Sequence, residues 1–378
     1  MNTSTGQRWI ALDILRGLSV IGMLLVINPG AWEQRYSWLN HVEWAGIIHV
    51  DMIFPTFLFC VGMALPISLA RRLSEGASKQ QLFLHIMWRS VALIFVGILL
   101  NAFPSFHWAN VRIPGVLQRI GLCYGIAASL VLCLSHGRDI YVRPLIIAST
   151  LIVLGYWFLL ANFAAPEIAA PAYDSVNSLP AYVDRQLFGL QHMWPYGTTG
   201  GAVTYDPEGA LSTLPACVNV ILGVVATLVF QREPKVRAAL IGLTVGVAFV
   251  VLALVWNQWL PIIKKIWTSS FVLFSSGVSI IALVWIGFLL EKIRAEKFLY
   301  VIHVFGANAL LAFIVSGVIG PLMDMSIGGS SIRAVGFDTL QHIVVDPLIA
   351  SLLYSFIVVS LIFLLMSFCY QKRWFLKL

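Results

Sequence analysis

The sequence predicts an all-α polytopic integral membrane protein of about ten transmembrane helices, with both termini on the cytoplasmic side. Hydrophobic residues make up 59% of the 378 residues and charged residues only 11%, whereas about 25% of the residues in soluble domains are charged. Apolar runs long enough to span a bilayer recur along the chain, and helices satisfy their own backbone hydrogen bonds in lipid. This composition excludes an ordinary soluble enzyme and a disordered chain.

Ten apolar segments are expected to cross the membrane, and they show no internal repeat. They lie at 10–27, 47–70, 84–103, 116–134, 144–162, 211–230, 238–256, 268–290, 299–319 and 345–366. The third and fourth segments contain Arg89 and Arg119. We expect residues 1–378 to form a single transmembrane domain whose largest loop, at about 163–210, lies outside the membrane.

The distribution of basic residues indicates the orientation of the chain. Fifteen of the 24 lysines and arginines lie in connections on the side of the N-terminus, six lie on the opposite side, and three lie within spans. Cytoplasmic connections are enriched in these residues, so we expect both termini in the cytoplasm and the connections 28–46 and 163–210 outside. The net charge of +7 is thereby explained by membrane orientation, and no nucleic-acid partner is expected.

Charged residues within the spans need partners or a function, because each is costly in lipid. Asp13 and Arg16 are three residues apart on one helix face, which suits either an ion pair or a ligand site. Asp51 lies in the second span, near its outer end, and has no neighbour in the sequence to pair with. We therefore expect its partner to come from another segment.

The string from Arg112 to Arg119 contains Pro114 and Gly115, which suit a helix start or a broken helix beside a cavity. Seven residues are about two helical turns, so we expect the two guanidinium groups on one helix face. They could hold an anionic ligand or pair with Asp51 and Glu208, and the sequence leaves both alternatives open.

His41 is the best candidate for a general base. Asn28, Glu43, Trp44 and Asp51 surround it within a short stretch of the predicted outer side, and histidine titrates near neutral pH. No two histidines have the spacing of a metal site with a carboxylate between them, so no bound metal is expected.

Several short strings match one known family in the same order along the chain. They are Leu12–Gly17, His41–Gly46, Asp51–Pro55, Arg112–Arg119, Asp206–Gly209, Leu211–Pro215, Lys265–Ser270, Gly306–Ala309 and Arg373–Lys377. Together they resemble the transmembrane acetyltransferase family of heparan-α-glucosaminide N-acetyltransferase and its bacterial relatives. The shared order covers nearly the whole chain.

The resemblance implies a multi-pass protein of the inner membrane that transfers an acetyl group from cytosolic acetyl-CoA to the amine of a glucosamine-type sugar on the periplasmic or lumenal side. The family's active histidine falls on His41 and its catalytic asparagine on Asn28, with two more residues between them than in the lysosomal form. The resemblance also implies a homodimer, and membrane lipid is an expected partner.

These expectations assign a role to each site residue. His41 would take the amine proton, Asn28 would donate a hydrogen bond to the oxyanion, and Asp51 would hold the useful tautomer of His41. The residues assigned to acetyl-CoA are Arg8, Arg16, Arg112, Arg119, Trp267 and Ser269. Those assigned to the sugar are Trp44, Asp206 and Glu208.

Three alternatives stay open. The first keeps the reaction but passes through an acetyl-histidine intermediate on His41. The second is a secondary transporter of a small polar or sugar substrate, because intramembrane charges with Pro and Gly breaks are typical of that class. The third is an acyltransferase of the same fold that acts on a sugar hydroxyl.

Overall fold

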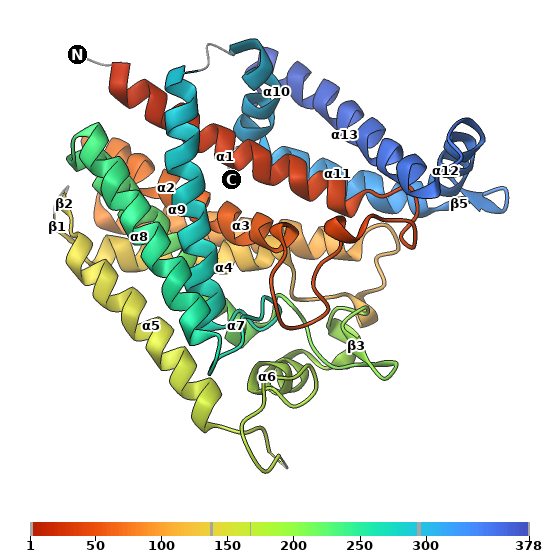
Figure 1. The fold of residues 1–378 in the computed structure, drawn as a ribbon, viewed down its shortest axis with the longest axis horizontal. Helices are drawn as coiled ribbons and strands as arrows, with labels where there is room; N and C mark the ends of the chain where they lie inside the picture. The colour runs from red at the N-terminus through yellow and green to blue at the C-terminus, as the bar shows by residue number, and fades with distance from the viewer. Residues whose placement is uncertain (1–2, 137–138, 167, 293–295, 377–378) are drawn as a thin grey trace.

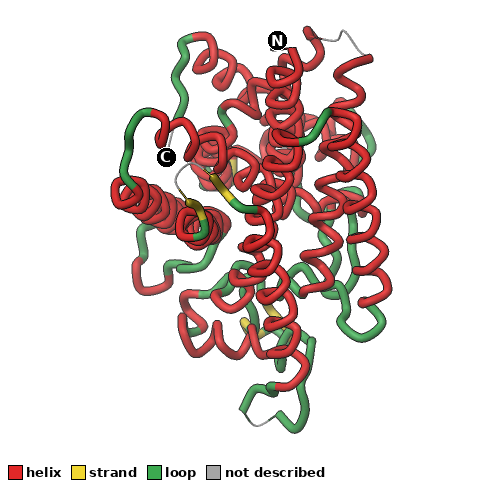
Figure 2. The backbone as a smooth tube through the Cα atoms, turned by 90° about the vertical axis from the view of Figure 1, so that its left-hand side faces the viewer, coloured by secondary structure: helices red, strands yellow, loops and turns green. Residues whose placement is uncertain are grey.

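The computed structural model describes residues 3–136, 139–166, 168–292 and 296–376. Most of the described chain is helical and the rest is mainly loop (Figure 2), and its only strands form three antiparallel two-residue hairpins. The hairpins are β1 (Ser135–His136) with β2 (Asp139–Ile140), β3 (Thr198–Thr199) with β4 (Ala202–Val203), and β5 (Ser326–Ile327) with β6 (Ser330–Ser331). The expected all-α class is confirmed.

Within the described ranges, nine helices are long and apolar enough to cross a membrane. They are α1 (Thr3–Ile27), α2 (Ile53–Ser74), α3 (Lys79–Ala102), α4 (Val116–Cys133), α5 (Val142–Asn162), α7 (Ala210–Arg232), α8 (Lys235–Trp256), α9 (Ser269–Lys292) and α13 (Pro347–Gln371). Their bounds agree with nine of the ten apolar segments to within seven residues at either end, because a long apolar run is sufficient to locate such a helix.

The remaining segment, expected as one continuous span at 299–319, is broken. Helix α10 (Glu296–Ala307) ends just before Asn308 and α11 (Ala309–Asp324) begins after it, with a bend of 83° between the two apolar stretches. Close contact with α1 holds α10 in place, since a Cβ atom on Gly306 would lie 2.0 Å from the carbonyl oxygen of Asp13. A hydropathy average over the segment contains no information about this bend.

Helix α7 lies at the centre of the bundle and α8 at its periphery. In their most apolar windows 78% of α7 is buried, against 22% of α8. Helices α2 and α7 approach closely because both have glycine at the crossing: a Cβ atom on Gly62 would lie 1.9 Å from the carbonyl oxygen of Val220, and one on Gly223 would lie 2.1 Å from that of Phe59. Such small residues allow helix backbones to pack closely in membranes.

The segments between the spans contain the remaining short elements. They are the helices α6 (Leu179–Phe188) and α12 (Ile332–Ile343) and the 3₁₀ turns η1 (Ser37–Leu39), η2 (His49–Met52), η3 (Trp108–Asn110) and η4 (Leu190–His192). The long connection 163–210 therefore contains α6, η4 and the β3–β4 hairpin. Hairpin β3–β4 and α6 lie at one end of the molecule and β1–β2 at another (Figure 1).

Candidate functional site

Four connections meet at one end of the bundle, and we call residues 28–48, 103–115, 163–209 and 257–268 the loop cluster. The backbone N–H of Gly46 donates to the carbonyl of Ile262, and that of Ile113 donates to the carbonyl of His192, both at 2.9 Å. Trp44 donates from Nε1 to the carbonyl of Tyr173 at 2.6 Å. These bonds fix segments that are far apart in the sequence against one another.

His41, Asp51 and Lys264 form the centre of the candidate site. Nδ1 of His41 lies 2.7 Å from Oδ1 of Asp51, and Nζ of Lys264 lies 3.3 Å from the same oxygen and 3.1 Å from the same nitrogen. The Asp51 side chain is buried, with its second oxygen accepting the backbone N–H of Ile48 at 3.2 Å. The partner expected for Asp51 from another segment is thus a histidine and a lysine.

This geometry favours Nε2 as the free nitrogen of His41. An ionised carboxylate can only accept, so the shorter contact of Nδ1, at 2.7 Å to Asp51 against 3.1 Å to Lys264, is satisfied when the Nδ1–H donates a hydrogen bond to Asp51 and Nε2 keeps its lone pair. Burial lowers the pKa of His41, a hydrogen bond from Nδ1 to Asp51 acts in the opposite direction, and the charge of Lys264 lowers it again. The net lowering favours the neutral imidazole, which is the form that accepts a proton.

Lys264 is the residue of this site that was not expected from the sequence. Burial lowers the pKa of its ammonium group, while Asp51 and Glu208 act in the opposite direction. The only signal in the sequence was the pair Lys264–Lys265 on the predicted outer side, where basic residues are few. Two adjacent lysines on the side where basic residues are normally few could therefore have indicated a functional role.

His41 and Lys264 line a cavity of about 150 Å³ that we call the histidine pocket. Glu208 is its third charged group, and the rest of the wall is mainly apolar and comes from α1, η2, α2, α4 and α11. A second cavity of about 170 Å³, which we call the arginine pocket, has three arginines and a histidine in its wall: Arg16, Arg72, Arg89 and His85. Phe57, Ala309 and Leu310 line both cavities.

The arginine pocket contains cationic groups without protein partners. Nε of Arg72 and Nε of Arg89 are buried and make no hydrogen bond, and the guanidinium of Arg89 lies 4.7 Å from the ring centroid of Tyr124. Arg16 forms an ion pair with Asp13 at 2.7 Å, one of the two alternatives that their spacing allowed, and donates to the carbonyl of Gly306 at 2.5 Å. Buried donors of this kind are suited to an anionic ligand.

Arg112 does not share a helix face with Arg119, contrary to the expectation from their spacing. Helix α4 begins at Val116, so Arg112 lies in the loop before it, with extended backbone at Gly115. Arg112 binds both oxygens of Asp206, at 2.9 and 2.6 Å, and reaches Glu208 at 2.5 Å. The carboxylates raise the pKa of Arg112 despite its burial. Of the two partners suggested by the sequence, Glu208 is confirmed and Asp51 is not found.

Arg119 is fully buried and lines neither pocket. Its Nη2 donates to the carbonyl of Gly209 at 3.0 Å and to Oγ of Ser212 at 2.5 Å, while Nε and Nη1 make no hydrogen bond. Its guanidinium lies 4.9 Å from the ring centroid of Trp267, and Trp267 itself donates to Oδ1 of Asn219 at 2.9 Å. These contacts place Arg119 and Trp267 in the packed interior of the helix bundle.

The remaining residues to which the sequence assigned a role lie in different parts of the structure. Ser269 is buried and donates to the carbonyl of Val153 at 2.7 Å, so it lies outside both pockets. Asn28 is buried and donates from Nδ2 to the carbonyl of Leu24 and to Oγ of Ser316, both at 2.9 Å. Trp44 packs edge-on against Tyr205 in the loop cluster. The side chain of Arg8 lies outside the described part of the structure.

Among the described residues, no group of histidine, cysteine or acidic side chains could hold a metal ion.

The fold and the site define a polytopic helical membrane protein with a histidine–aspartate–lysine group facing a cavity. A family profile described as "Domain of unknown function (DUF5009)" matches residues 8–164. Heparan-alpha-glucosaminide N-acetyltransferase of Homo sapiens is 28% identical over 306 residues, which cover 69% of this chain and 46% of that protein. The Mus musculus protein of the same name is 28% identical over 312 residues, or 71% of this chain and 47% of the relative.

The chain is therefore related to the transmembrane acetyltransferase family that its sequence resembles, and that resemblance is confirmed. It spans about half the length of the curated relatives it matches. The profile match includes His41, Asn28, Asp51 and the basic residues of the arginine pocket, whereas Lys264 lies beyond it.

Proposed function

We propose that the protein is a transmembrane acetyltransferase that moves an acetyl group from acetyl-CoA, bound at the arginine pocket, to the amine of a glucosamine-type sugar at the histidine pocket. The observation that carries the proposal is the shared wall: Phe57, Ala309 and Leu310 line a basic cavity on one side and the cavity of His41 on the other. A donor that extends past these residues would bring its thioester to the histidine.

The arginine pocket supports coenzyme A as the donor. Its phosphates are anionic, and Arg72 and Arg89 offer buried N–H groups that lack protein partners, as phosphate recognition requires. Arg16 adds a further positive charge, although Asp13 already neutralises part of it. Arg72 lies in a connection that the basic-residue distribution predicts to be cytoplasmic, where acetyl-CoA is made available, and Arg16 and Arg89 lie within the adjoining spans.

The chemistry at the histidine pocket follows from the free lone pair on Nε2 of His41. The sugar amine, in its neutral form, attacks the thioester carbonyl, a carbon–nitrogen bond forms and His41 removes the amine proton. When the intermediate collapses, the carbon–sulfur bond breaks and the thiolate of coenzyme A leaves and takes up the proton held by His41, which restores the neutral imidazole. Asp51 acts as a positioning residue, since it holds the Nδ1–H of His41.

The developing oxyanion needs a donor near His41. Lys264 lines the same pocket and brings a positive charge, which makes it a candidate for electrostatic stabilisation of the transition state. Asn28 stays a candidate on the strength of the resemblance. Both N–H groups of its amide are already donated to Leu24 and Ser316, so this role requires Asn28 to release one of those bonds when the donor is bound.

The sugar acceptor would reach the histidine pocket from the loop cluster. Glu208 reaches the histidine pocket from a segment whose conformation is fixed by Arg112, and its carboxylate suits the hydroxyl or amine groups of a sugar. Asp206 is fully engaged by Arg112 and by the backbone N–H groups of Trp194 and Glu208. We therefore assign sugar contact to Glu208 and a supporting role to Asp206.

Purified protein in detergent, incubated with labelled acetyl-CoA and a panel of amino sugars, tests the proposal. The expected result is an N-acetylated product by mass spectrometry, absent with correctly folded His41→Ala protein. Transfer to the N-acetylated sugars instead would assign an O-acetyltransferase. Exchange of label between acetyl-CoA and CoA without acceptor would assign an acetyl-histidine intermediate. Folded protein that acetylates nothing in the panel would contradict the proposal.

A secondary transporter is the second candidate, and the break at Asn308 favours it, because broken helices line the substrate sites of such proteins. Uptake of a labelled sugar into sealed liposomes containing the protein, without acetyl-CoA, would support transport. Acetyl transfer in detergent needs no sealed compartment, so the two experiments separate the candidates. A homodimer in the inner membrane is part of our proposal by relation to the family.

A further inference from the structure

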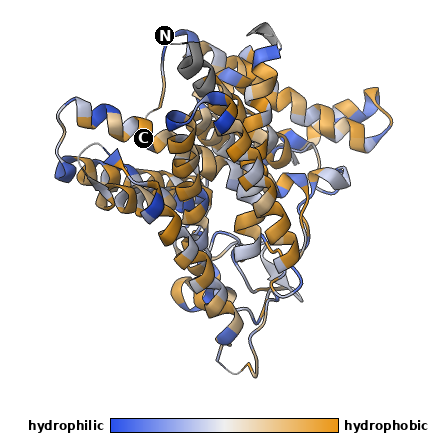
Figure 3. Cartoon of the chain, turned by 60° about the vertical axis from the view of Figure 1, so that its left-hand side comes forward, coloured by the Kyte–Doolittle hydropathy of each residue, from blue (hydrophilic) through white to orange (hydrophobic). Residues whose placement is uncertain are grey.

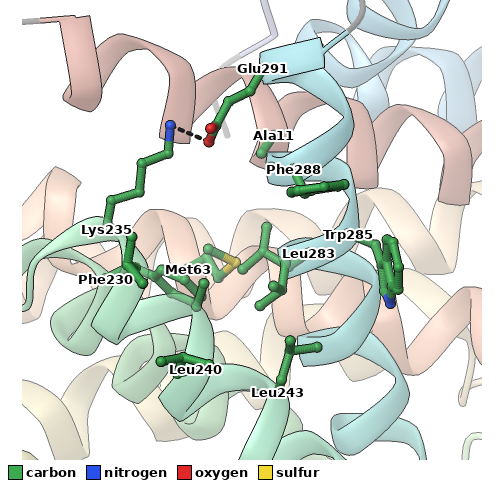
Figure 4. A pocket seen from close by; sticks show the side chains of 14 residues that line it. Ala11, Met63, Phe230, Lys235, Leu240, Leu243, Leu283, Trp285, Phe288 and Glu291 are labelled. Atoms are coloured by element: carbon green, nitrogen blue, oxygen red, sulfur yellow. Dashed lines mark ion pairs between the residues drawn. The ribbon is translucent and has the colours of Figure 1, made fainter.

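Helices α8 and α9 form a groove that the proposed reaction does not use. They cross closely at two glycines, where a Cβ atom on Gly277 would lie 2.6 Å from the carbonyl oxygen of Gly246. From this crossing they separate toward Lys235, at the start of α8, and Glu291, near the end of α9 (Figure 4). The space between them is a cavity of about 540 Å³, within the range of about 300–1,000 Å³ typical of ligand pockets.

The interior of this groove, which we call the α8–α9 groove, is apolar. Met63 and Phe230 form part of its floor, and Leu240, Leu243 and Leu283 lie on its walls (Figure 4). Helix α8 is the most exposed of the nine spans in the described chain, so this groove opens to the surrounding lipid. An apolar cavity with such an opening is suited to a hydrocarbon chain rather than to water.

The open end of the groove contains both signs of charge. Lys235 and Glu291 face each other across it and form an ion pair (Figure 4). The ammonium group of Lys292 lies 4.5 Å from the ring centroid of Phe288, which lines the same groove. These residues lie at helix ends on the predicted cytoplasmic side, the depth at which lipid headgroups are found.

We infer that the α8–α9 groove binds a phospholipid whose headgroup has both a phosphate and a primary ammonium group, as in phosphatidylethanolamine. One acyl chain fills the apolar groove and the headgroup inserts into the Lys235–Glu291 ion pair: the phosphate contacts Lys235 and Lys292, and the ammonium replaces Lys235 as the partner of Glu291. Charge complementarity selects this headgroup: an uncharged glycerol headgroup gives Glu291 no cation, and a quaternary ammonium gives it no N–H donor.

Two glycines provide a matched pair of variants. Gly287 lines the groove on α9, and Gly155 lies on the exposed face of α5; a Cβ atom at either position would meet no atom within 4 Å. Gly287→Trp places a large side chain in the groove without a backbone clash, whereas Gly155→Trp adds the same side chain to another lipid-facing helix. Glu291→Gln removes the acceptor charge and leaves the apolar groove intact.

The test is native mass spectrometry of the purified protein titrated with phosphatidylethanolamine or phosphatidylglycerol. We expect one tightly held phosphatidylethanolamine on the unmodified protein and on Gly155→Trp, with affinity at least about tenfold lower for Gly287→Trp. Glu291→Gln should lose the preference for phosphatidylethanolamine over phosphatidylglycerol. Equal affinity in Gly287→Trp, or no headgroup preference in the unmodified protein, would overturn the inference. So would a lipid-free dimer that Gly287→Trp dissociates, because a second copy would then occupy the groove.

Discussion

Nδ1 of His41 lies 2.7 Å from Oδ1 of Asp51, and this contact joins the loop after α1 to the turn that precedes α2. Asp51 is buried, whereas 44% of the His41 side chain is exposed. The carboxylate is thus fixed within the protein and the imidazole extends from it into a cavity. Such an arrangement orients a base and leaves its reactive nitrogen accessible to a second molecule.

Replacement of His41 tests the base directly. We expect His41→Ala to lower kcat for acetyl transfer by about 10²–10⁴-fold, the usual contribution of general base catalysis, with little change in the KM for acetyl-CoA because the arginine pocket is untouched. Steady-state kinetics with labelled acetyl-CoA measure both constants, and the elution volume in gel filtration checks the fold. An unchanged kcat in folded protein would remove His41 from the mechanism.

The charges around His41 predict opposite shifts of the pH profile in two variants. Lys264 lowers the pKa of His41 and Asp51 raises it. The neutral imidazole is the active base, so activity falls as the pH drops through this pKa. Lys264→Met should therefore move the acidic limb of kcat to higher pH, and Asp51→Asn should move it to lower pH. All profiles use the same acceptor, whose own amine then contributes equally to each.

Both variants should also lose activity at their optimum pH. The opposed pH shifts separate this electrostatic arrangement from a merely structural role, which would not produce them. We expect a loss of about 10²–10³-fold for Lys264→Met if it stabilises the oxyanion. Shifts in the same direction for Lys264→Met and Asp51→Asn would contradict the proposed electrostatic arrangement.

The arginine pocket predicts a dependence on the nucleotide part of the donor. Arg72→Gln and Arg89→Gln should each raise the KM for acetyl-CoA by roughly tenfold or more, because a hydrogen bond to a charged group contributes about 1.5–3 kcal/mol. The KM for acetyl-pantetheine, which lacks the nucleotide phosphates, should not change. Arg143→Gln, an exposed arginine at the start of α5, is the control. Equal effects on both donors would exclude phosphate binding in this pocket.

Arg112 is expected to contribute to stability. The Asp206 side chain is completely buried, so Arg112→Met leaves a buried carboxylate without its counter-ion, which costs about 3–5 kcal/mol. A clear drop in the thermal midpoint, followed by tryptophan fluorescence in detergent, is the expected result. Combining Arg112→Met with Asp206→Asn should recover part of the loss, because the fully buried charge is then gone while that of Glu208 remains. No recovery would indicate that the ion pair is not the cause.

Nine of the ten expected spans were predictable from the sequence, as was the common helix face of Asp13 and Arg16. Both depend on short-range patterns: a run of apolar residues defines a span, and a three-residue spacing puts two side chains on one helix face. The bend at Asn308 was not predictable, because it depends on how α10 packs against α1 at Gly306. The prediction that Arg112 and Arg119 share a helix face was wrong for a related reason. It required the helix to begin before Arg112, whereas α4 begins at Val116.

By itself the sequence determined the all-α membrane class, the selection of His41 and Asp51, and the relation to the acetyltransferase family, because hydrophobicity and local motifs are properties of short stretches of chain. Only the tertiary structure decided that Lys264 joins His41 and Asp51 from 213 positions after Asp51, and that two cavities share Phe57, Ala309 and Leu310. It also decided that Arg119 and Trp267 lie in the packed interior of the helix bundle. Contacts between distant segments arise from helix packing, which no single stretch of sequence specifies.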